Sequence, residues 1–236
     1  MPFDSAGFPA RDQVLVRSGS DVERRFMASV YRWMTLGLGL TALVAFYVAS
    51  SEDALRLVIG NRFVFFGLMI AEIALVFTIS AAVHRLSAAA AGGLFLLYSA
   101  LNGATLSVIL LVYTGSSVAL AFVTTAATFG TMSVFATVTR RDLSSWGSFL
   151  FMGLVGVVIA SVVNIFLHSS AMSFVISCAA VVVFTGLAAY DTQKLRAFAR
   201  AGGGSAAMPV NGALALYLDF VNLFLALLRL LGNRRS

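Results

Sequence analysis

Residues 147–167 read GSFLFMGLVGVVIASVVNIFL, a run of 21 residues that contains no charged side chain. A helix of about 20 predominantly apolar residues is long enough to cross the hydrocarbon core of a bilayer. Six further runs of similar length and mostly apolar character lie at 27–49, 63–83, 88–113, 118–138, 171–190 and 210–231. The sequence therefore predicts seven transmembrane helices.

The composition of the whole chain supports this prediction. Of its 236 residues, 60% are hydrophobic and 11% are charged, whereas a soluble domain carries about 25% charged residues. Seven spans use most of the chain, so we expect an all-α integral membrane domain over residues 23–236 and no separate soluble domain. Residues 1–22 are polar and are expected to form a flexible cytoplasmic tail, without the apolar segment of a cleavable signal peptide.

The basic residues indicate the orientation of the chain. With a cytoplasmic N-terminus and seven crossings, eleven of the 16 lysine and arginine residues lie on the cytoplasmic side, as the positive-inside rule requires. Arg229, Arg234 and Arg235 then lie outside, so the charge pattern leaves open whether the last helix crosses fully. The basic residues occupy helix ends and tails and form no patch among exposed aromatic residues, which argues for the lipid bilayer and against nucleic acid as a partner.

Three acidic residues, Glu72, Asp191 and Asp219, fall within or at the edge of the apolar runs. An ionised carboxylate there is costly unless it is paired, hydrated or protonated, so each residue marks a candidate functional site. Asp191 lies three residues before Lys194, which is expected to reach the membrane surface. Asp219 lies deeper in the next run, which returns in the opposite direction, so the two aspartates face each other if that run begins below the surface. The alternative for each is a neutral aspartate that donates to helix backbone.

A contact between Asp191 and Asp219 would form a pH sensor. Two carboxyl groups in contact away from bulk water cannot both ionise at low cost, so they share a proton and titrate as a unit. When both are ionised, their oxygens suit Ca²⁺, although two carboxylates are too few for a tight site. We therefore expect calcium to contact the pair transiently and no cofactor to be bound. Asn222, three residues after Asp219, is positioned to satisfy a carboxyl group or to help hydrate a cation.

Glu72 lies at the centre of the second run, with no lysine or arginine one turn away. It needs a partner from another helix, and two interpretations stay open: a residue on an ion path, or a protonated glutamate bonded to a neighbouring helix. Asn102 and Thr105 are interpreted as hydrogen-bonding residues between helices. Arg85, at the cytoplasmic end of the second run, either extends to lipid headgroups or reaches Asp191 as a latch.

Both candidate aspartates lie in segments that resemble the signature segments of the Bax inhibitor-1 family, FTGLAAYDTQKLR at residues 184–196 and GALALYLDFVNLFLALLRLLGNRR at 212–235. Similar segments are FMASVYRWMTLGLGLTA at 26–42, LYSALNGATLS at 97–107 and RRDLSSWGSFLFMGLVG at 140–156. The resemblance covers nearly everything after Arg24 and is greatest to the bacterial inner-membrane members.

The resemblance implies a seven-helix fold with the C-terminal helix packed centrally among the other six. It also implies a pH-sensitive calcium leak channel, with calcium as the transported ion, gated by a buried aspartate pair. Asp191 and Asp219 match that pair by motif, and Arg85 matches, by position, a basic residue that bonds one aspartate in an alternative state. An acid corresponding to Glu72 occurs in some members. The cell-death role of the eukaryotic members is not transferred to this chain.

Two other functional classes stay open. A non-conducting regulator would bind a membrane protease or another membrane protein through the small-residue faces of its helices. An intramembrane aspartyl protease would share one proton between its two aspartates to activate water. Against the protease, LYLD at 216–219 lacks the Gly-x-Gly-Asp pattern and no Pro-Ala-Leu-Pro segment follows. We therefore expect no enzymatic activity, and a pH-dependent calcium flux through liposomes would discriminate the channel from the regulator.

Overall fold

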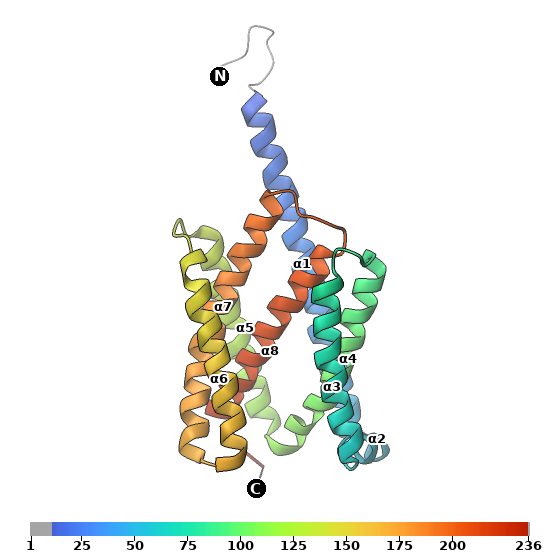
Figure 1. Ribbon diagram of the computed structural model, residues 1–236. Coiled ribbons are helices and arrows are strands. Elements are labelled where there is room, and N and C mark those ends of the chain that lie inside the picture. Colours follow the sequence, from blue (N-terminus) through green and yellow to red (C-terminus); the bar gives the residue numbers. More distant parts are fainter. Residues whose placement is uncertain (1–10, 236) are drawn as a thin grey trace.

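The computed structural model describes the backbone of residues 11–235 and the side chains of residues 20–235. The described chain is a bundle of long helices joined by short connectors (Figure 1). The helices are α1 (Arg11–Ser50), α2 (Glu52–Val58), α3 (Arg62–Ala82), α4 (Ala88–Val112), α5 (Gly115–Val138), α6 (Gly147–Leu167), α7 (Ser170–Arg200) and α8 (Met208–Leu231), with a short 3-10 turn, η1 (Ser144–Trp146). Seven of these, all except α2, are long and apolar enough to span a membrane, which confirms the predicted class.

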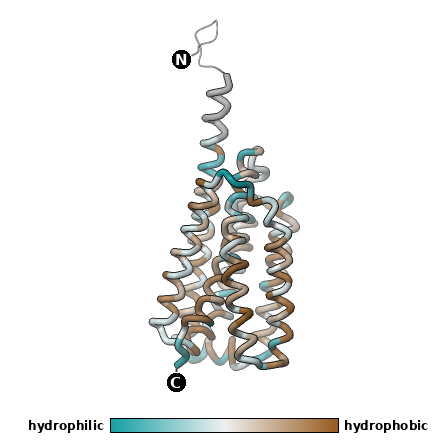
Figure 2. The backbone as a smooth tube through the Cα atoms, turned by 90° about the vertical axis from the view of Figure 1, so that its left-hand side faces the viewer, coloured by the Kyte–Doolittle hydropathy of each residue, from teal (hydrophilic) through white to brown (hydrophobic). Residues whose placement is uncertain are grey.

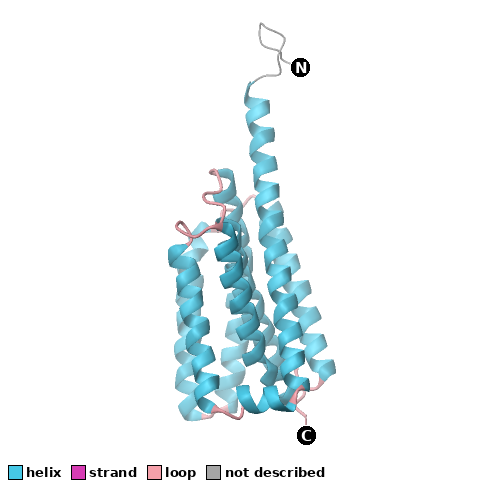
Figure 3. Ribbon diagram, turned by 90° about the vertical axis from the view of Figure 1, so that its right-hand side faces the viewer, coloured by secondary structure: helices cyan, strands magenta, loops and turns pink. Residues whose placement is uncertain are grey.

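The predicted and observed spans differ most at α1 and α7. α1 begins at Arg11, so residues 11–22 of the predicted tail are helical and extend beyond the other helices (Figure 3). No proline interrupts this stretch, and each residue added to an existing helix gains a backbone hydrogen bond. Residues 1–10 of the predicted tail lie outside the described residues. α7 continues past the predicted end at Tyr190 to Arg200, which shortens the connector to α8 to residues 201–207.

The distribution of hydropathy along the bundle fits a membrane. Hydrophobic residues line the lengths of the helices, and hydrophilic segments gather at their ends (Figure 2). Large apolar side chains such as Phe63, Phe77 and Phe166 are exposed on the outer faces. In a bilayer these faces contact lipid, and each helix satisfies its own backbone hydrogen bonds.

α8 is the most extensively buried of the seven spanning helices. It packs against α1, α3, α4, α5 and α7. α6 packs mainly on α7, although its Leu154 and Val157 reach the apolar cluster that α7 and α8 form together. The more detailed expectation, a last helix enclosed by all six others, is therefore not confirmed.

The C-terminal residues lie at the end of the bundle opposite the N-terminus (Figure 1). The N–H of Thr114 donates to the carbonyl oxygen of Asn233 at 3.1 Å, and the N–H of Arg235 donates to that of Val112 at 2.9 Å. The segment after α8 is thus bonded to the turn between α4 and α5. α8 therefore runs from one end of the bundle to the other, and its full crossing of the membrane stays a prediction.

Glycines allow α1 and α4 to approach each other closely. A Cβ atom at Gly103 would lie 2.6 Å from the carbonyl oxygen of Thr41, and one at Gly37 would lie 2.5 Å from Cζ of Phe95. Small residues at helix contacts are the usual means of close packing in membranes. This approach brings α1 and α4 together beside a polar cluster that also includes α3 and α8.

Candidate functional site

Asp191 on α7 and Asp219 on α8 lie next to each other, close enough for their carboxyl groups to interact. At a rise of 1.5 Å per residue, they lie roughly 14 Å and 17 Å from the helix ends that the connector joins. The similar depths follow from the continuation of α7 to Arg200. Two carboxyl groups in contact away from bulk water bond each other only when one of them carries a hydrogen.

The hydrogen bonding of the pair is incomplete. Asp219 is 5% exposed, and its buried Oδ2 atom has no hydrogen-bond partner among the described residues. The only other buried side-chain atom without a partner between residues 20 and 235 is Oγ1 of Thr185, also on α7. Asp191 is half-buried and lies within the electrostatic reach of Lys194. Oδ2 of Asp219 is therefore a buried oxygen whose acceptor capacity is unused in this structure, its contact with Asp191 apart.

The pair does not form a complete metal site. A resident calcium ion takes about six to eight oxygen ligands, and the two carboxyl groups supply four. The described residues contain no group of three or more His, Cys, Asp or Glu side chains able to hold a metal ion. Any cation at the pair would therefore be held by few protein atoms.

Asn222 and Arg85 do not join the pair in this structure. The amide of Asn222 donates to the carbonyl oxygen of Leu218 at 2.8 Å, and residues 20–235 show no hydrogen bond between Asn222 and Asp219. One of the two amide hydrogens of Asn222 is thus used within its own helix, and its expected part in satisfying a carboxyl group or hydrating a cation stays a prediction. Arg85 is exposed just after α3, and no ion pair joins it to Asp191 in the described chain. The latch stays a prediction.

Glu72 on α3 belongs to a separate polar cluster that crosses four helices. Its Oε2 accepts from Nδ2 of Asn102 at 3.1 Å, and its Oε1 accepts from the hydroxyl of Thr105 at 2.9 Å, both on α4. The hydroxyl of Tyr217 on α8 donates to Oδ1 of Asn102 at 2.9 Å. The same hydroxyl lies 2.7 Å from that of Thr41 on α1. We call these five residues the Glu72 network.

The hydroxyl of Thr105 lies 2.9 Å from Oε1 of Glu72 and 3.0 Å from the carbonyl oxygen of Asn102, so its one hydrogen is shared between two acceptors. Both carboxyl oxygens of Glu72 therefore accept from side chains of α4. The charge of Glu72, and with it the choice between the two interpretations drawn from the sequence, stays a prediction.

The structure confirms the predicted hydrogen bonding of Asn102 and Thr105 between helices. Tyr217 and Thr41 complete the Glu72 network, and their residue types alone do not distinguish them from other hydroxyl residues of the spans. A hydroxyl residue inside an apolar run is common in membrane helices and usually bonds its own backbone or a neighbouring helix. The position of Tyr217, two residues before Asp219, was the one available signal.

A third cluster lies at the N-terminal end of the bundle. Glu23 on α1 accepts hydrogen bonds from Nε of both Arg196 and Arg200 on α7. Arg196 also donates through Nη1 to the carbonyl oxygens of Thr137 at 2.7 Å and Ala136 at 3.3 Å, at the end of α5. A cation there satisfies carbonyls that have no partner within the helix. The cluster joins α1, α5 and α7, and the sequence does not predict it because Glu23 and Arg196 are 173 residues apart.

Seven spanning helices with two acidic side chains in contact between α7 and α8 define a multi-pass membrane protein with titratable groups in its interior. A family model described as "Inhibitor of apoptosis-promoting Bax1" matches residues 23–236. The chain belongs to this family, the Bax inhibitor-1 family, which confirms the resemblance seen in the sequence.

Relatives match along most of the chain. Inner membrane protein YbhL of Escherichia coli K12 is 48% identical over 234 residues, which cover 97% of this chain and 99% of YbhL. A protein of Deinococcus radiodurans, described as uncharacterized, is 48% identical over 219 residues, 92% of this chain and 93% of its own. Another of Borreliella burgdorferi is 42% identical over 219 residues, 91% and 94% of the two chains. Neither the family description nor these names carry an enzymatic activity.

Proposed function

We propose that the protein is a pH-sensitive calcium leak channel of the inner membrane, with a cytoplasmic N-terminus, in which Asp191 and Asp219 form the sensor and gate. The proposal rests on the buried contact between these two carboxyl groups, which come from consecutive helices and leave Oδ2 of Asp219 without a partner. Membership of the Bax inhibitor-1 family supports it, because the pair falls in both segments that resemble the family signatures.

The number of protons on the pair determines how α7 and α8 contact each other. With one shared proton, the two carboxyl groups bond each other. Loss of that proton leaves two negative charges side by side, which desolvation and repulsion both oppose. A second proton leaves two neutral groups, each with a hydrogen that needs an acceptor. Either change alters the contact and, with it, the packing of α8 on α7.

The connector between the two helices permits such a movement. Gly202, Gly203 and Gly204 have φ angles of 113°, 70° and 64°, which residues with a side chain rarely adopt. Three consecutive glycines form a hinge between α7 and α8. In this proposal α8 reorients at the hinge while both helices keep their backbone hydrogen bonds.

Calcium is the transported ion in this proposal. The ionised pair attracts a divalent cation, and its small number of oxygen ligands favours transit over storage. Glu72 and Asn222 have their polar groups engaged within the bundle. In this proposal Glu72 joins α3 to α4, Asn222 bonds the backbone of its own helix, and neither lines the ion path.

Calcium flux into liposomes tests the proposal. Purified full-length protein is reconstituted into liposomes that contain a calcium indicator, and flux is recorded from about pH 5 to about pH 8. Interacting carboxyl pairs in protein interiors gain or lose a proton within this range. The wild type is expected to show a pH-dependent flux. Asp191→Asn and Asp219→Asn are each expected to remove most of this dependence, because one titrating partner is lost.

Asp53→Asn is the matched control, since it makes the same chemical change at an exposed position on α2 and is expected to keep the pH profile. Well-folded wild-type protein that passes no calcium at any pH would overturn the channel and favour the non-conducting regulator. Peptide cleavage that is lost in Asp219→Asn would instead favour the protease.

A further inference from the structure

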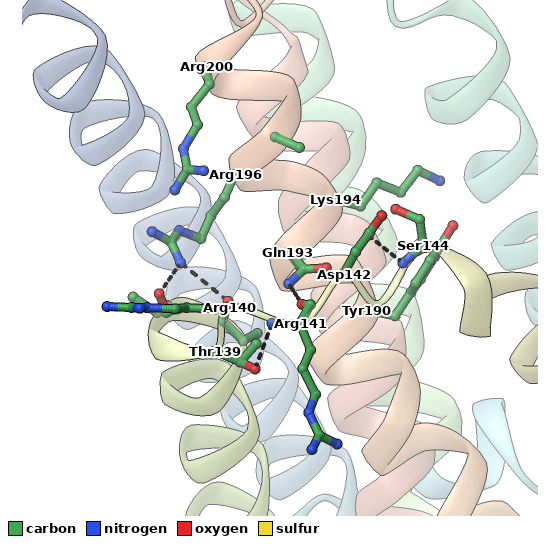
Figure 4. A pocket seen from close by; sticks show the side chains of 13 residues that line it. Thr139, Arg140, Arg141, Asp142, Ser144, Tyr190, Gln193, Lys194, Arg196 and Arg200 are labelled. Atoms are coloured by element: carbon green, nitrogen blue, oxygen red, sulfur yellow. Dashed lines mark hydrogen bonds between the residues drawn. The ribbon is translucent and has the colours of Figure 1, made fainter. Parts of the chain in front are cut away.

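A cavity of about 460 Å³ opens at the N-terminal end of the bundle, beside the connection between α5 and α6 (Figure 4). The last turns of α7 form one wall, and residues 136–144 form another. The charged side chains that line it are five cations and one acid, namely Arg140, Arg141, Lys194, Arg196, Arg200 and Asp142. The cavity therefore combines residues from two elements that are distant in the sequence.

The cations of this cavity are not all neutralised by the protein. Arg196 and Arg200 are paired with Glu23. Arg140, Arg141 and Lys194 are exposed, and none of them has an ion pair within residues 20–235. Among the lining residues, these three cations outnumber the one acid, Asp142, so the cavity has an excess of positive charge. Lys194 also lies within the electrostatic reach of Asp191, which does not line the cavity.

The loop that carries Arg140 and Arg141 is fixed against α7 by Gln193. Nε2 of Gln193 donates to the carbonyl oxygen of Arg141 at 2.9 Å, and its Oε1 accepts from the N–H of Leu143 at 2.7 Å. Figure 4 shows the side chains of Arg140, Arg141 and Lys194 extending in different directions around this bonded loop. All three side chains are long and have several rotatable bonds, and the backbone that carries Arg140 and Arg141 is held in place by Gln193.

Neighbouring residues indicate that the cavity lies at the level of lipid headgroups. Trp146, two residues after the lining residue Ser144, is exposed, and Val138 on α5 and Phe149 on α6 expose apolar side chains. Tryptophan is enriched at the membrane–water interface, and apolar side chains face the hydrocarbon beyond it. A molecule in the cavity therefore has lipid on one side and water on the other.

We propose that this cavity binds a phosphate group supplied by an anionic phospholipid of the surrounding leaflet. Arginine and lysine donate charge-assisted hydrogen bonds to phosphate oxygens, and basic pockets between spanning helices suit lipid headgroups. The volume lies within the range of ligand pockets, about 300 to 1,000 Å³. The position of the cavity at the level of the lipid headgroups and the exposed apolar side chains beside it favour a lipid over a free anion in solution.

Native mass spectrometry of the full chain in detergent tests this site without any transport measurement. The probes are dioleoylphosphatidylglycerol, dioleoylphosphatidylcholine and inorganic phosphate, each added separately. The wild type is expected to prefer phosphatidylglycerol to phosphatidylcholine. The variant R140Q/R141Q/K194Q is expected to bind phosphatidylglycerol roughly 100-fold more weakly, because each basic residue at an anionic surface contributes about a factor of five. Arg196 and Arg200 stay unchanged because they support the fold.

The matched control is R24Q/R25Q/R32Q, which removes the same charge from α1 in the same half of the bundle and is expected to keep the wild-type affinity. An equal loss in both triple variants, or a wild type that does not distinguish the two lipids, would overturn the site. Inorganic phosphate that binds as tightly as phosphatidylglycerol would overturn the lipid as its source. If the triple variant does not fold, Lys194→Gln alone carries the test, with an expected loss of about fivefold.

Discussion

The Asp191–Asp219 pair and the Glu72 network both bury acidic groups among the helices, but they differ in how their hydrogen bonds are completed. Both oxygens of Glu72 have partners, whereas Oδ2 of Asp219 has none among the described residues. A satisfied network favours one arrangement, because any movement breaks bonds in a medium that offers no replacement. A pair joined by a single shared proton changes whenever that proton is lost or another arrives. The completeness of hydrogen bonding, rather than position in a span, therefore separates a structural acid from a candidate sensor.

The largest expected effect comes from exchanging one acid in each region for its amide. Asp219→Asn is expected to flatten the pH profile of calcium flux, whereas Glu72→Gln is expected to keep it. A glutamine at position 72 keeps the length of the side chain and one acceptor oxygen beside Asn102 and Thr105, but it has no charge to titrate. Flux in liposomes and the thermal unfolding midpoint in detergent measure the two outcomes. A flat profile in Glu72→Gln would show that the assignment of the sensor to the aspartate pair is wrong.

A smaller effect is expected when the Glu72 network loses a hydroxyl. Tyr217→Phe keeps the ring contacts with Phe95 and Tyr98, whose centroids lie 5.7 Å and 5.6 Å away. It leaves Oδ1 of Asn102 without its donor, which is expected to lower the free energy of unfolding by about 1 kcal/mol. Thermal unfolding in detergent measures this loss, and the lipid-facing change Tyr47→Phe serves as control. An unchanged midpoint in Tyr217→Phe would contradict a structural role for the network.

The smallest expected effect concerns the basic cavity. Hydrogen bonds from the side chain and the backbone N–H of Ser144 hold the pKa of Asp142 below its usual range, so this carboxylate is charged at neutral pH. Asp142→Asn removes the one acid that lines the cavity and is expected to strengthen phosphatidylglycerol binding about fivefold. The gain should persist at every pH above the pKa of Asp142 and vanish in acid, where the wild-type carboxyl is protonated too.

Native mass spectrometry at several pH values measures this change, and Glu52→Gln at the opposite end of the bundle is the control. Equal affinities for wild type and Asp142→Asn at neutral pH would put Asp142 out of reach of the bound headgroup.

The sequence predicted the spans well where their ends coincide with the ends of the helices. α6 has the predicted bounds, 147–167, and α4 and α5 differ from their predicted runs by a few residues. α7 is the exception, because hydropathy falls at Asp191 while the helix continues to Arg200. Its last turns are polar, and their arginines bond Glu23 on α1. Hydropathy measures transfer into lipid, so it does not detect a helix that continues into water.

Among the candidate site residues, the sequence identified each buried acid but not its partners. The amide of Asn222 bonds Leu218 on its own helix, although its spacing suggested Asp219. Tyr217 bonds Asn102, 115 residues earlier in the chain. Local spacing determines which residues share a helix face, but not which face meets another helix.

The sequence by itself determined the number of spans and the three acids that lie in or beside them. Both are local properties, because a spanning helix must satisfy its backbone hydrogen bonds within its own segment and a charge in lipid is costly wherever it stands. The tertiary structure alone decided that Asp191 meets Asp219 and that Glu72 is bonded by α4. These contacts depend on the depth and rotation of each helix, which the packing of segments far apart in the chain fixes.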